Sequence, residues 1–283
     1  MIFCDIELSR KLERAEGRAN ADFVATRARL DASVGAEWMD IGGTYVMFDG
    51  VGSPCTQTFG LGLFEDANAE DLSVIETFFR ERGSDIFHEV SPLADQELLG
   101  LLSERRYRPI ELTNVMYRPL VDIGTSGRPE TSRITTRIIS PNEFELWART
   151  SAAGWATEHE GLADFMFDFG SVSAQCAGAY PYIAEIDDNA VATGMMFVHE
   201  DVAMFAGAST VPDGRKQGAQ NALFEARLDH AAKLGCTLAA MGASPGSQSQ
   251  KNAQKNGFQI AYTRTKWQLS GENDLRMKDT EQP

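Results

Sequence analysis

The sequence predicts an α/β protein with a mixed sheet, divided into two units. Apolar stretches with the character of strands alternate with helical patterns along most of the 283 residues, an order typical of α/β folds. Residues 121–132, which include Gly124, Gly127 and Pro129, are the best linker candidate in the chain. A length of 283 residues suits one large or two small domains, at roughly 100–200 residues per domain. We therefore expect one domain over 1–120 and another over 133–270.

The first unit is expected to begin with a helix and to continue as alternating strands and helices. The clearest helical signal is the set Leu72, Ile75, Phe78 and Phe79, which follows a start signal at Asn68. The predicted elements are a helix over 5–30, strands over 38–48 and 58–64, a helix over 68–82, a strand over 85–90, a helix over 92–105 and a strand over 107–117.

The second unit repeats this order of elements and adds a hairpin. Asp187, Asp188 and Asn189 form a turn signal between two apolar runs. The predicted elements are a strand over 134–139, a helix over 142–153, hairpin strands over 179–186 and 190–198, a strand over 201–210, a helix from about 220 to 234, a strand over 237–241, a helix ending at 256 and a strand over 258–269. The acidic and polar tail, 271–283, is expected to be frayed.

The connection at 211–220 is the strongest candidate for a binding site. It leaves an apolar strand, carries Arg215, Lys216 and Gly218, and opens a helix in which Phe224, Leu228 and Ala231 share one face. The first turn of a helix offers free N–H groups and the positive end of the helix dipole. The sequence therefore predicts that an anion binds here.

The segment Arg215-Lys-Gln-Gly218-Ala-Gln220 resembles the pyrophosphate loop of the GNAT family of acyl-CoA N-acyltransferases. That pattern is Arg or Gln, two residues, Gly, one residue, then Gly or Ala. Arg215 and Gly218 match it, whereas Gln220 stands at the last small position. The resemblance implies two tandem GNAT-like domains. The N-terminal one would be degenerate, because residues 65–71 are acidic where a pyrophosphate loop would lie.

The resemblance also implies the residues that bind acetyl-CoA as cosubstrate. Backbone groups of the preceding strand would contact the pantetheine arm and the thioester, the loop would bind the pyrophosphate, and the last helix would flank the arm. By position these residues are Ser209, Thr210, Val211, Arg215, Lys216, Gln217, Gly218, Ala219, Gln220 and Asn252.

The catalytic groups are less clearly indicated. Much of the family has a Tyr that protonates the leaving thiolate, at the position of Ala253 in this sequence. The substitutes are Ser249, Tyr262 or water. Glu185 and His159 are the candidates for the base, although His159 could equally be a solvated loop residue and its neighbours Glu158 and Glu160 could instead hold a cationic acceptor. No metal-ligand spacing is present.

These features predict transfer of an acetyl group from acetyl-CoA to a primary amine of a small molecule or peptide, by direct attack. The alternative is a non-catalytic acyl-CoA-binding or sensor protein. A net charge of −15 argues against a nucleic-acid partner. Scattered cysteines, no apolar run of about 18 residues and no signal-peptide pattern favour a cytoplasmic protein without a membrane segment. Nothing in the sequence indicates the oligomeric state.

Overall fold

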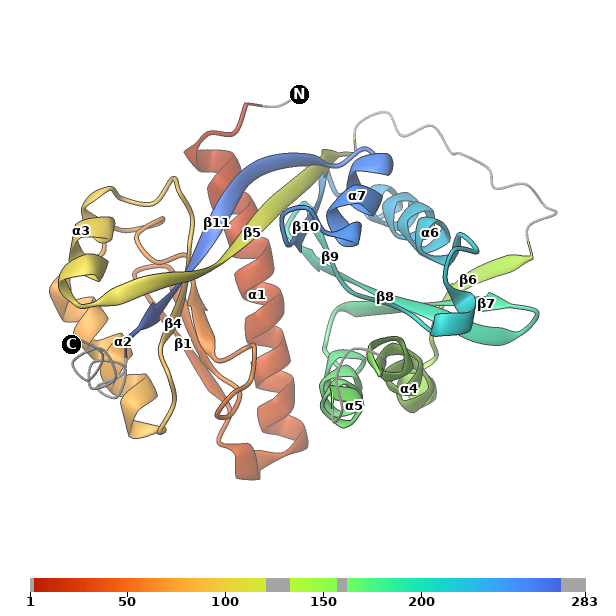
Figure 1. The fold of residues 1–283 in the computed structure, drawn as a ribbon, viewed down its shortest axis with the longest axis horizontal. Coiled ribbons are helices and arrows are strands. Elements are labelled where there is room, and N and C mark those ends of the chain that lie inside the picture. The colour runs from red at the N-terminus through yellow and green to blue at the C-terminus, as the bar shows by residue number, and fades with distance from the viewer. Residues whose placement is uncertain (1–2, 121–132, 157–161, 271–283) are drawn as a thin grey trace, which may run out of the picture.

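The structure is a computed structural model that describes residues 3–120, 133–156 and 162–270. The predicted linker 121–132, the predicted tail 271–283 and His159 with its neighbours Glu158 and Glu160 lie outside the described residues. Within the described part, one mixed sheet of eleven strands runs through the whole molecule (Figure 1). None of the helices described there combines the length and the apolar character needed to cross a membrane.

The first half, residues 3–120, starts with a long helix and continues as five strands and two helices. Its elements are α1 (Ile6–Leu30), β1 (Glu37–Ile41), β2 (Thr44–Phe48), β3 (Gln57–Phe59), α2 (Ala69–Glu81), β4 (Phe87–Val90), α3 (Glu97–Glu104) and β5 (Tyr107–Pro119). The start signal at Asn68 is confirmed, because its side chain accepts hydrogen bonds from the N–H groups of Glu70 and Asp71.

The second half, residues 133–270, contains the predicted hairpin and four helices. Its elements are β6 (Ile134–Ile138), α4 (Phe144–Trp155), α5 (Leu162–Ser173), β7 (Ala179–Ile186), β8 (Asn189–His199), β9 (Val202–Thr210), α6 (Ala219–Lys233), β10 (Leu238–Ala243), α7 (Gln248–Lys255) and β11 (Gln259–Leu269). For the aromatic residues between 154 and 170, the sequence left open a packed core helix or an acceptor pocket, and Leu162, Phe165 and Phe169 lie on helix α5.

Two predicted strands are shorter than expected. The stretch 38–48 forms two strands, because Gly42 and Gly43 adopt positive φ angles of +57° and +80° and turn the chain back in a hairpin. The strand predicted over 58–64 ends at Phe59, since Gly60 and Gly62 also have positive φ. Turns likewise occupy most of 91–96, so the helix expected over 92–105 begins at Glu97.

The two halves exchange their final strands. The sheet order is β1-β2-β3-β4-β11-β5-β10-β9-β8-β7-β6. Strand β11 of the second half pairs with β4 of the first, and β5 of the first half pairs with β10 of the second. Strands β5 and β11 also pair with each other in the centre. The division into domains at 121–132 therefore remains a prediction, because the described halves share one continuous sheet.

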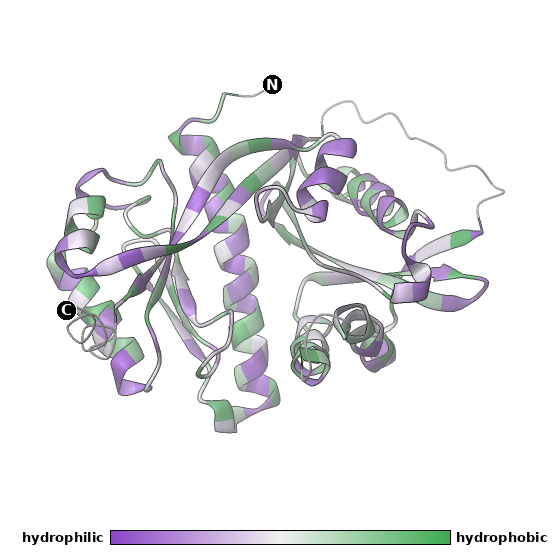
Figure 2. Ribbon diagram, viewed as in Figure 1, coloured by the Kyte–Doolittle hydropathy of each residue, from purple (hydrophilic) through white to green (hydrophobic). Residues whose placement is uncertain are grey.

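Helix α1 packs against strands of both halves. Its residues Leu8, Leu12 and Ala15 join a core cluster with Met204 of β9 and Ala240 of β10, while Phe23 packs with strands of the first half. Hydrophobic and hydrophilic residues alternate along this helix in Figure 2. Helices α4 and α5 lie on the same side of the sheet as α1, whereas α6 packs on the opposite side with Phe205. One face of the sheet is thus covered jointly by the helices of both halves.

Candidate active site

The candidate site begins where β9 and β10 part. These strands are parallel, and Val202–Met204 of β9 pair with Leu238–Ala240 of β10. The pairing stops there, although both strands continue. The connection from β9 to α6 lies just beyond this point. It includes a 3-10 turn over Pro212–Gly214 and ends at Gly218, which caps α6 with φ +91°. The predicted order of strand, loop and helix is therefore confirmed.

A pocket of about 680 Å³ opens at this connection, and we call it the loop pocket. It is bordered by the end of β9, by the loop and first turn of α6, and by Gln248, Asn252 and Lys255 on α7. The charged side chains among the lining residues that the structure describes are Arg215, Lys216 and Lys255. In a chain of net charge −15, a pocket lined by three cations is suited to a polyanionic ligand.

The backbone of the loop adds to this preference for anions. The N–H groups of Ala219, Gln220 and Asn221 belong to the first turn of α6 and have no carbonyl four residues earlier within the helix. Lys216 and Gly218 both have positive φ, at +63° and +91°, so the chain curls around the helix start. A phosphate group placed here would meet N–H donors and the positive end of the helix dipole.

The side chain of Arg215 also holds the loop in place. Arg215 donates from Nη2 to the carbonyl of Gly154 at 2.9 Å and from Nε to the carbonyl of Thr210 at 3.3 Å. These bonds fix the loop to the end of α4 and to the end of β9. Arg215 therefore shapes the pocket as well as contributing its charge.

Gln220, which departs from the GNAT pattern, has a structural role. Its Nε2 lies within hydrogen-bond distance of the carbonyls of Ser209 and Thr193, at 2.7 and 3.2 Å, and of Thr210 Oγ1 at 3.0 Å. The side chain thus ties α6 to β8 and β9. A Gly or Ala at this position could not make these bonds, so the departure from the pattern adds a support to the end of β9.

The strand end predicted to face the thioester offers fewer free groups than expected. The Val211 N–H donates to the carbonyl of Val191 at 3.0 Å, and the Ser209 carbonyl accepts from Gln220. The Ser209 hydroxyl donates to the carbonyl of Ser151 at 2.8 Å. The N–H group of Val211 is therefore used in a hydrogen bond to β8, while Ser209 and Thr210 line the loop pocket together with Ala208.

A second pocket, of about 340 Å³, lies on the face covered by α1, α4 and α5, and we call it the apolar pocket. Residues of β9 from Ala206 to Ala208 form one wall, and residues of α1 form another. Trp155 and Ala208 border both pockets. An anion-binding pocket and an apolar pocket thus meet where β9 ends.

The predicted catalytic residues do not gather at this meeting point. Tyr262 is buried and donates its hydroxyl to Glu13 Oε1 at 2.8 Å, and burial raises its pKa well above the usual value. Glu185 on β7 accepts from Arg137 at 2.9 Å, which also pairs with Glu143. Ser249 is exposed on α7. None of these three is among the lining residues of either pocket, whereas Asn252 lines the loop pocket.

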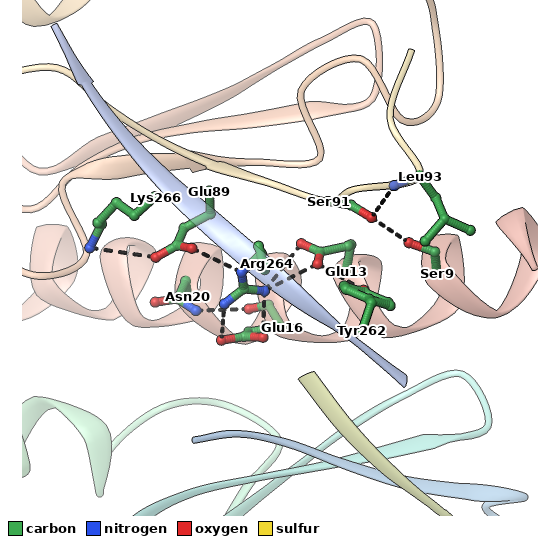
Figure 3. A network of polar contacts seen from close by, with 10 residues as sticks. All are labelled: Ser9, Glu13, Glu16, Asn20, Glu89, Ser91, Leu93, Tyr262, Arg264 and Lys266. Carbon is green, nitrogen blue, oxygen red and sulfur yellow. Dashed lines mark hydrogen bonds and ion pairs between the residues drawn. The ribbon is translucent and has the colours of Figure 1, made fainter. Parts of the chain in front are cut away.

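A buried ionic network, which the sequence reasoning missed, lies beside the apolar pocket. Figure 3 shows Glu13 and Glu16 of α1 and Glu89 of β4 converging on Arg264 of β11. Lys266 approaches Glu89 to 3.5 Å. Burial, together with the adjacent Glu16 and Glu89 carboxylates, raises the pKa of Glu13 to about 7 against the opposing effect of Arg264. The sequence feature that could have indicated this network is the spacing of Glu13 and Glu16, which are three residues apart in α1 and so share one face of the helix.

Comparison with known proteins identifies the fold. The sequence matches no known family model and no curated protein. Solved structures show the fold. A GCN5-related N-acetyltransferase from Kribbella flavida is similar over 88% of this chain and 95% of its own, with a TM-score of 0.62 and 15% identity. The chain thus has the fold of GCN5-related N-acetyltransferases.

Two further solved structures share the fold, and the first of them is a tandem protein. A tandem GNAT protein from the clavulanic acid biosynthesis pathway, solved without acetyl-CoA, has a TM-score of 0.54 and 11% identity, covering 81% of this chain and 79% of its own. A GCN5-related N-acetyltransferase from Sphaerobacter thermophilus has a TM-score of 0.52 and 14% identity, covering 76% and 72%.

Proposed function

We propose that the protein transfers an acetyl group from acetyl-CoA to a primary amine. The CoA pyrophosphate would bind in the loop pocket, held by the N–H groups at the start of α6 and by Arg215, Lys216 and Lys255. The acetyl end would reach the strip of β9 from Ala206 to Ala208, and the amine would approach it from the apolar pocket. The observation that carries the proposal is that a cation-lined pocket and an apolar pocket meet at Trp155 and Ala208.

The reaction requires only direct attack. The neutral amine nitrogen attacks the thioester carbonyl carbon, the new C–N bond forms, and the C–S bond breaks with its electron pair leaving on sulfur. One proton lost from nitrogen is released before attack, and a second is lost as the amide forms. The CoA thiolate gains a proton from water in the open loop pocket, and a thiolate is only moderately basic, so it needs no strong acid. Ala253 and the buried Tyr262 offer no general acid there, so none is assigned.

Calorimetric titration of the full chain with CoA and, separately, with ATP tests the binding step. We expect CoA to bind more tightly than ATP, because the loop pocket continues beyond the phosphates towards the apolar pocket. Lys216→Glu reverses one lining charge and is expected to weaken CoA binding at least tenfold. Lys251→Glu is the matched control, because Lys251 is exposed on α7 and is not among the lining residues.

Release of free CoA thiol from acetyl-CoA in the presence of an amine panel tests the transfer step. Amine-dependent release supports the enzyme. Binding of CoA without release for any amine would instead support a non-catalytic acyl-CoA-binding protein. If neither CoA nor ATP binds, the loop is an ordinary basic turn and the proposal is wrong.

A further inference from the structure

The apolar pocket is formed by both halves of the chain, and most of its lining side chains are apolar or aromatic. Its lining includes the aromatic side chains of Phe23, Trp147, Trp155, Phe169 and Phe197. Among the lining residues that the structure describes, Glu16 is the only one with a formal charge. A ligand that fits this wall has an apolar, ring-sized body and a single charged end.

Glu16 is held in a fixed position by Arg264. Its Oε2 accepts from Arg264 Nη1 at 2.8 Å and its Oε1 accepts from Nη2 at 3.0 Å, a two-point contact that orients the carboxylate. The Glu16 side chain keeps 15% of its surface exposed, whereas Glu13 in the same network keeps none. Each carboxylate oxygen can accept more than one hydrogen bond, so Glu16 can still receive a ligand donor.

The carboxylate also lies close to where the strands part. A Cβ atom at Gly242 of β10 would stand 3.6 Å from Glu16 Oε1, so the absence of a side chain at Gly242 leaves the carboxylate against the backbone of β10. Gly242 lies beyond the last β10 residue that pairs with β9. Ala206, Gly207 and Ala208 of β9 line the same pocket. Glu16 thus lines the pocket beside the stretch of β10 that no longer pairs with β9.

We infer that the acyl acceptor is a monoamine with an apolar, aromatic-sized body, whose ammonium group is held by Glu16 of the first half. This inference rests on the proposed function and names the class of acceptor for it. With all its groups ionised, the network of Glu13, Glu16, Glu89, Arg264 and Lys266 carries one net negative charge, which one ammonium group at Glu16 would balance. The five aromatic rings favour a body without further charges. A polycationic acceptor, such as a polyamine, would leave charges against aromatic side chains without carboxylate partners.

Binding of amines to the full chain can be followed without turnover, because Trp147 and Trp155 line the pocket and their fluorescence reports on a ligand there. The probes are 2-phenylethylamine, the uncharged 2-phenylethanol and spermidine. We expect 2-phenylethylamine to bind at least tenfold more tightly than 2-phenylethanol, and spermidine to give no saturable change.

Glu16→Gln keeps the shape of the side chain and removes its charge. We expect it to weaken 2-phenylethylamine binding at least tenfold and to leave 2-phenylethanol and CoA binding unchanged. Glu89→Gln is the matched control: it removes another carboxylate from the same Arg264, but Glu89 is not among the lining residues. We expect this variant to keep amine binding within about threefold of the parent.

The outcomes separate the inference from the proposed function. Equal binding of 2-phenylethylamine to Glu16→Gln and to the parent protein, or no binding at all, would overturn the inference. Transfer to spermidine in preference to 2-phenylethylamine would also overturn it while leaving acetyl transfer intact. Charge-dependent binding of 2-phenylethylamine in a protein that does not bind CoA would support the amine pocket and contradict the transferase.

Discussion

Arg264 Nη1 lies 3.2 Å from both carboxylate oxygens of Glu13, although the two residues are 251 positions apart in the sequence. Arg264 belongs to the exchanged strand β11, and Glu13 belongs to α1, which packs against both halves. Both side chains are almost fully buried, at 2% and 0% exposure. The network around them contains three carboxylates and two cations, so it is electrically neutral when Glu13 is protonated.

Replacing Arg264 with Met should strongly destabilise the fold. The variant leaves Glu13, Glu16 and Glu89 together without their shared cation, and removing one partner of a buried ion pair costs about 3–5 kcal/mol. Urea unfolding at pH 7 measures the loss. Arg149→Met is the control, because Arg149 pairs with Glu145 on an exposed helix face and should change stability by less than about 1 kcal/mol. A similar small loss for both variants would contradict the role of the network.

Stability should decrease as the pH rises through the range in which Glu13 ionises. Burial raises the pKa of Glu13 from 4.5 to about 7, so the folded state holds this proton more firmly than the unfolded chain. The stabilisation is fully present below pH 4.5 and is lost as the pH rises to about 7. It amounts to on the order of 3 kcal/mol.

The comparison with Glu13→Gln isolates this effect. The groups that face Glu13 are Arg264, Glu16, Glu89 and Tyr262, and all remain in the variant. The difference in unfolding free energy between the parent protein and Glu13→Gln should therefore fall between pH 4.5 and 7. A difference that stays constant over this range would show that the pKa of Glu13 is not raised.

Gly218→Val should weaken CoA binding about tenfold or more. The site has room for a side chain, since a Cβ atom there would meet only Ile134 Cδ1, at 3.7 Å. Its φ of +91°, however, disfavours a β-branched residue, so the first turn of α6 must rearrange. Calorimetry with CoA measures the change.

Gly83→Val is the control for Gly218→Val. Gly83 follows α2 in the first half, has φ +64° and has open space around its Cβ position. It should lose a comparable amount of stability, about 1–2 kcal/mol, and bind CoA as the parent protein does. If Gly218→Val folds and keeps its CoA affinity, the assignment of the loop is wrong.

Gly194→Ala should be destabilising because of a buried arginine on α6. Arg227 is 1% exposed, donates to the carbonyls of Leu223 and Met195 at 3.0 and 3.1 Å, and has its pKa lowered by burial to about 9. A Cβ atom at Gly194 would lie 2.9 Å from Arg227 Cζ. The two hydrogen bonds prevent the guanidinium from moving aside, so we expect a loss of about 1–3 kcal/mol.

A double-mutant cycle checks this explanation. Combining Gly194→Ala with Arg227→Met removes the planar group that the new methyl would strike, so the two changes should couple favourably by at least about 1 kcal/mol. Gly100→Ala on the exposed face of α3 meets no neighbour and should not destabilise. Additive losses in the cycle would place the strain elsewhere.

Local patterns predicted most of the elements, and glycines within the predicted strands explain the strands that proved too long. The periodic set around Phe79, the cap at Asn68 and the turn at Asp187 depend on neighbours in sequence, and each was confirmed. The shortened strands followed from Gly42, Gly43, Gly60 and Gly62, which adopt positive φ angles. The pair Gly42-Gly43 is a hairpin signal that was overlooked in the sequence.

The candidate site divides in the same way. The loop at Arg215 and Gly218 was predicted because its signal is contiguous. Glu16 was not predicted as a site residue. Its contact with Arg264 spans 248 residues of sequence, and the pocket that it lines is formed partly by the other half. Tyr262 was chosen for its hydroxyl, but its partner Glu13 could not be found from sequence spacing.

The position of β11 also affects how the nascent chain folds. At about 5–20 residues per second, the ribosome makes β11 roughly 10–40 s after β4. During that time the edge of β4 that β11 will cover lacks its final partner, and an uncovered strand edge is a template for wrong pairing. The first half therefore cannot complete its own sheet before β11 is made. The time for which the edge of β4 stays uncovered during synthesis is set by the length of the second half.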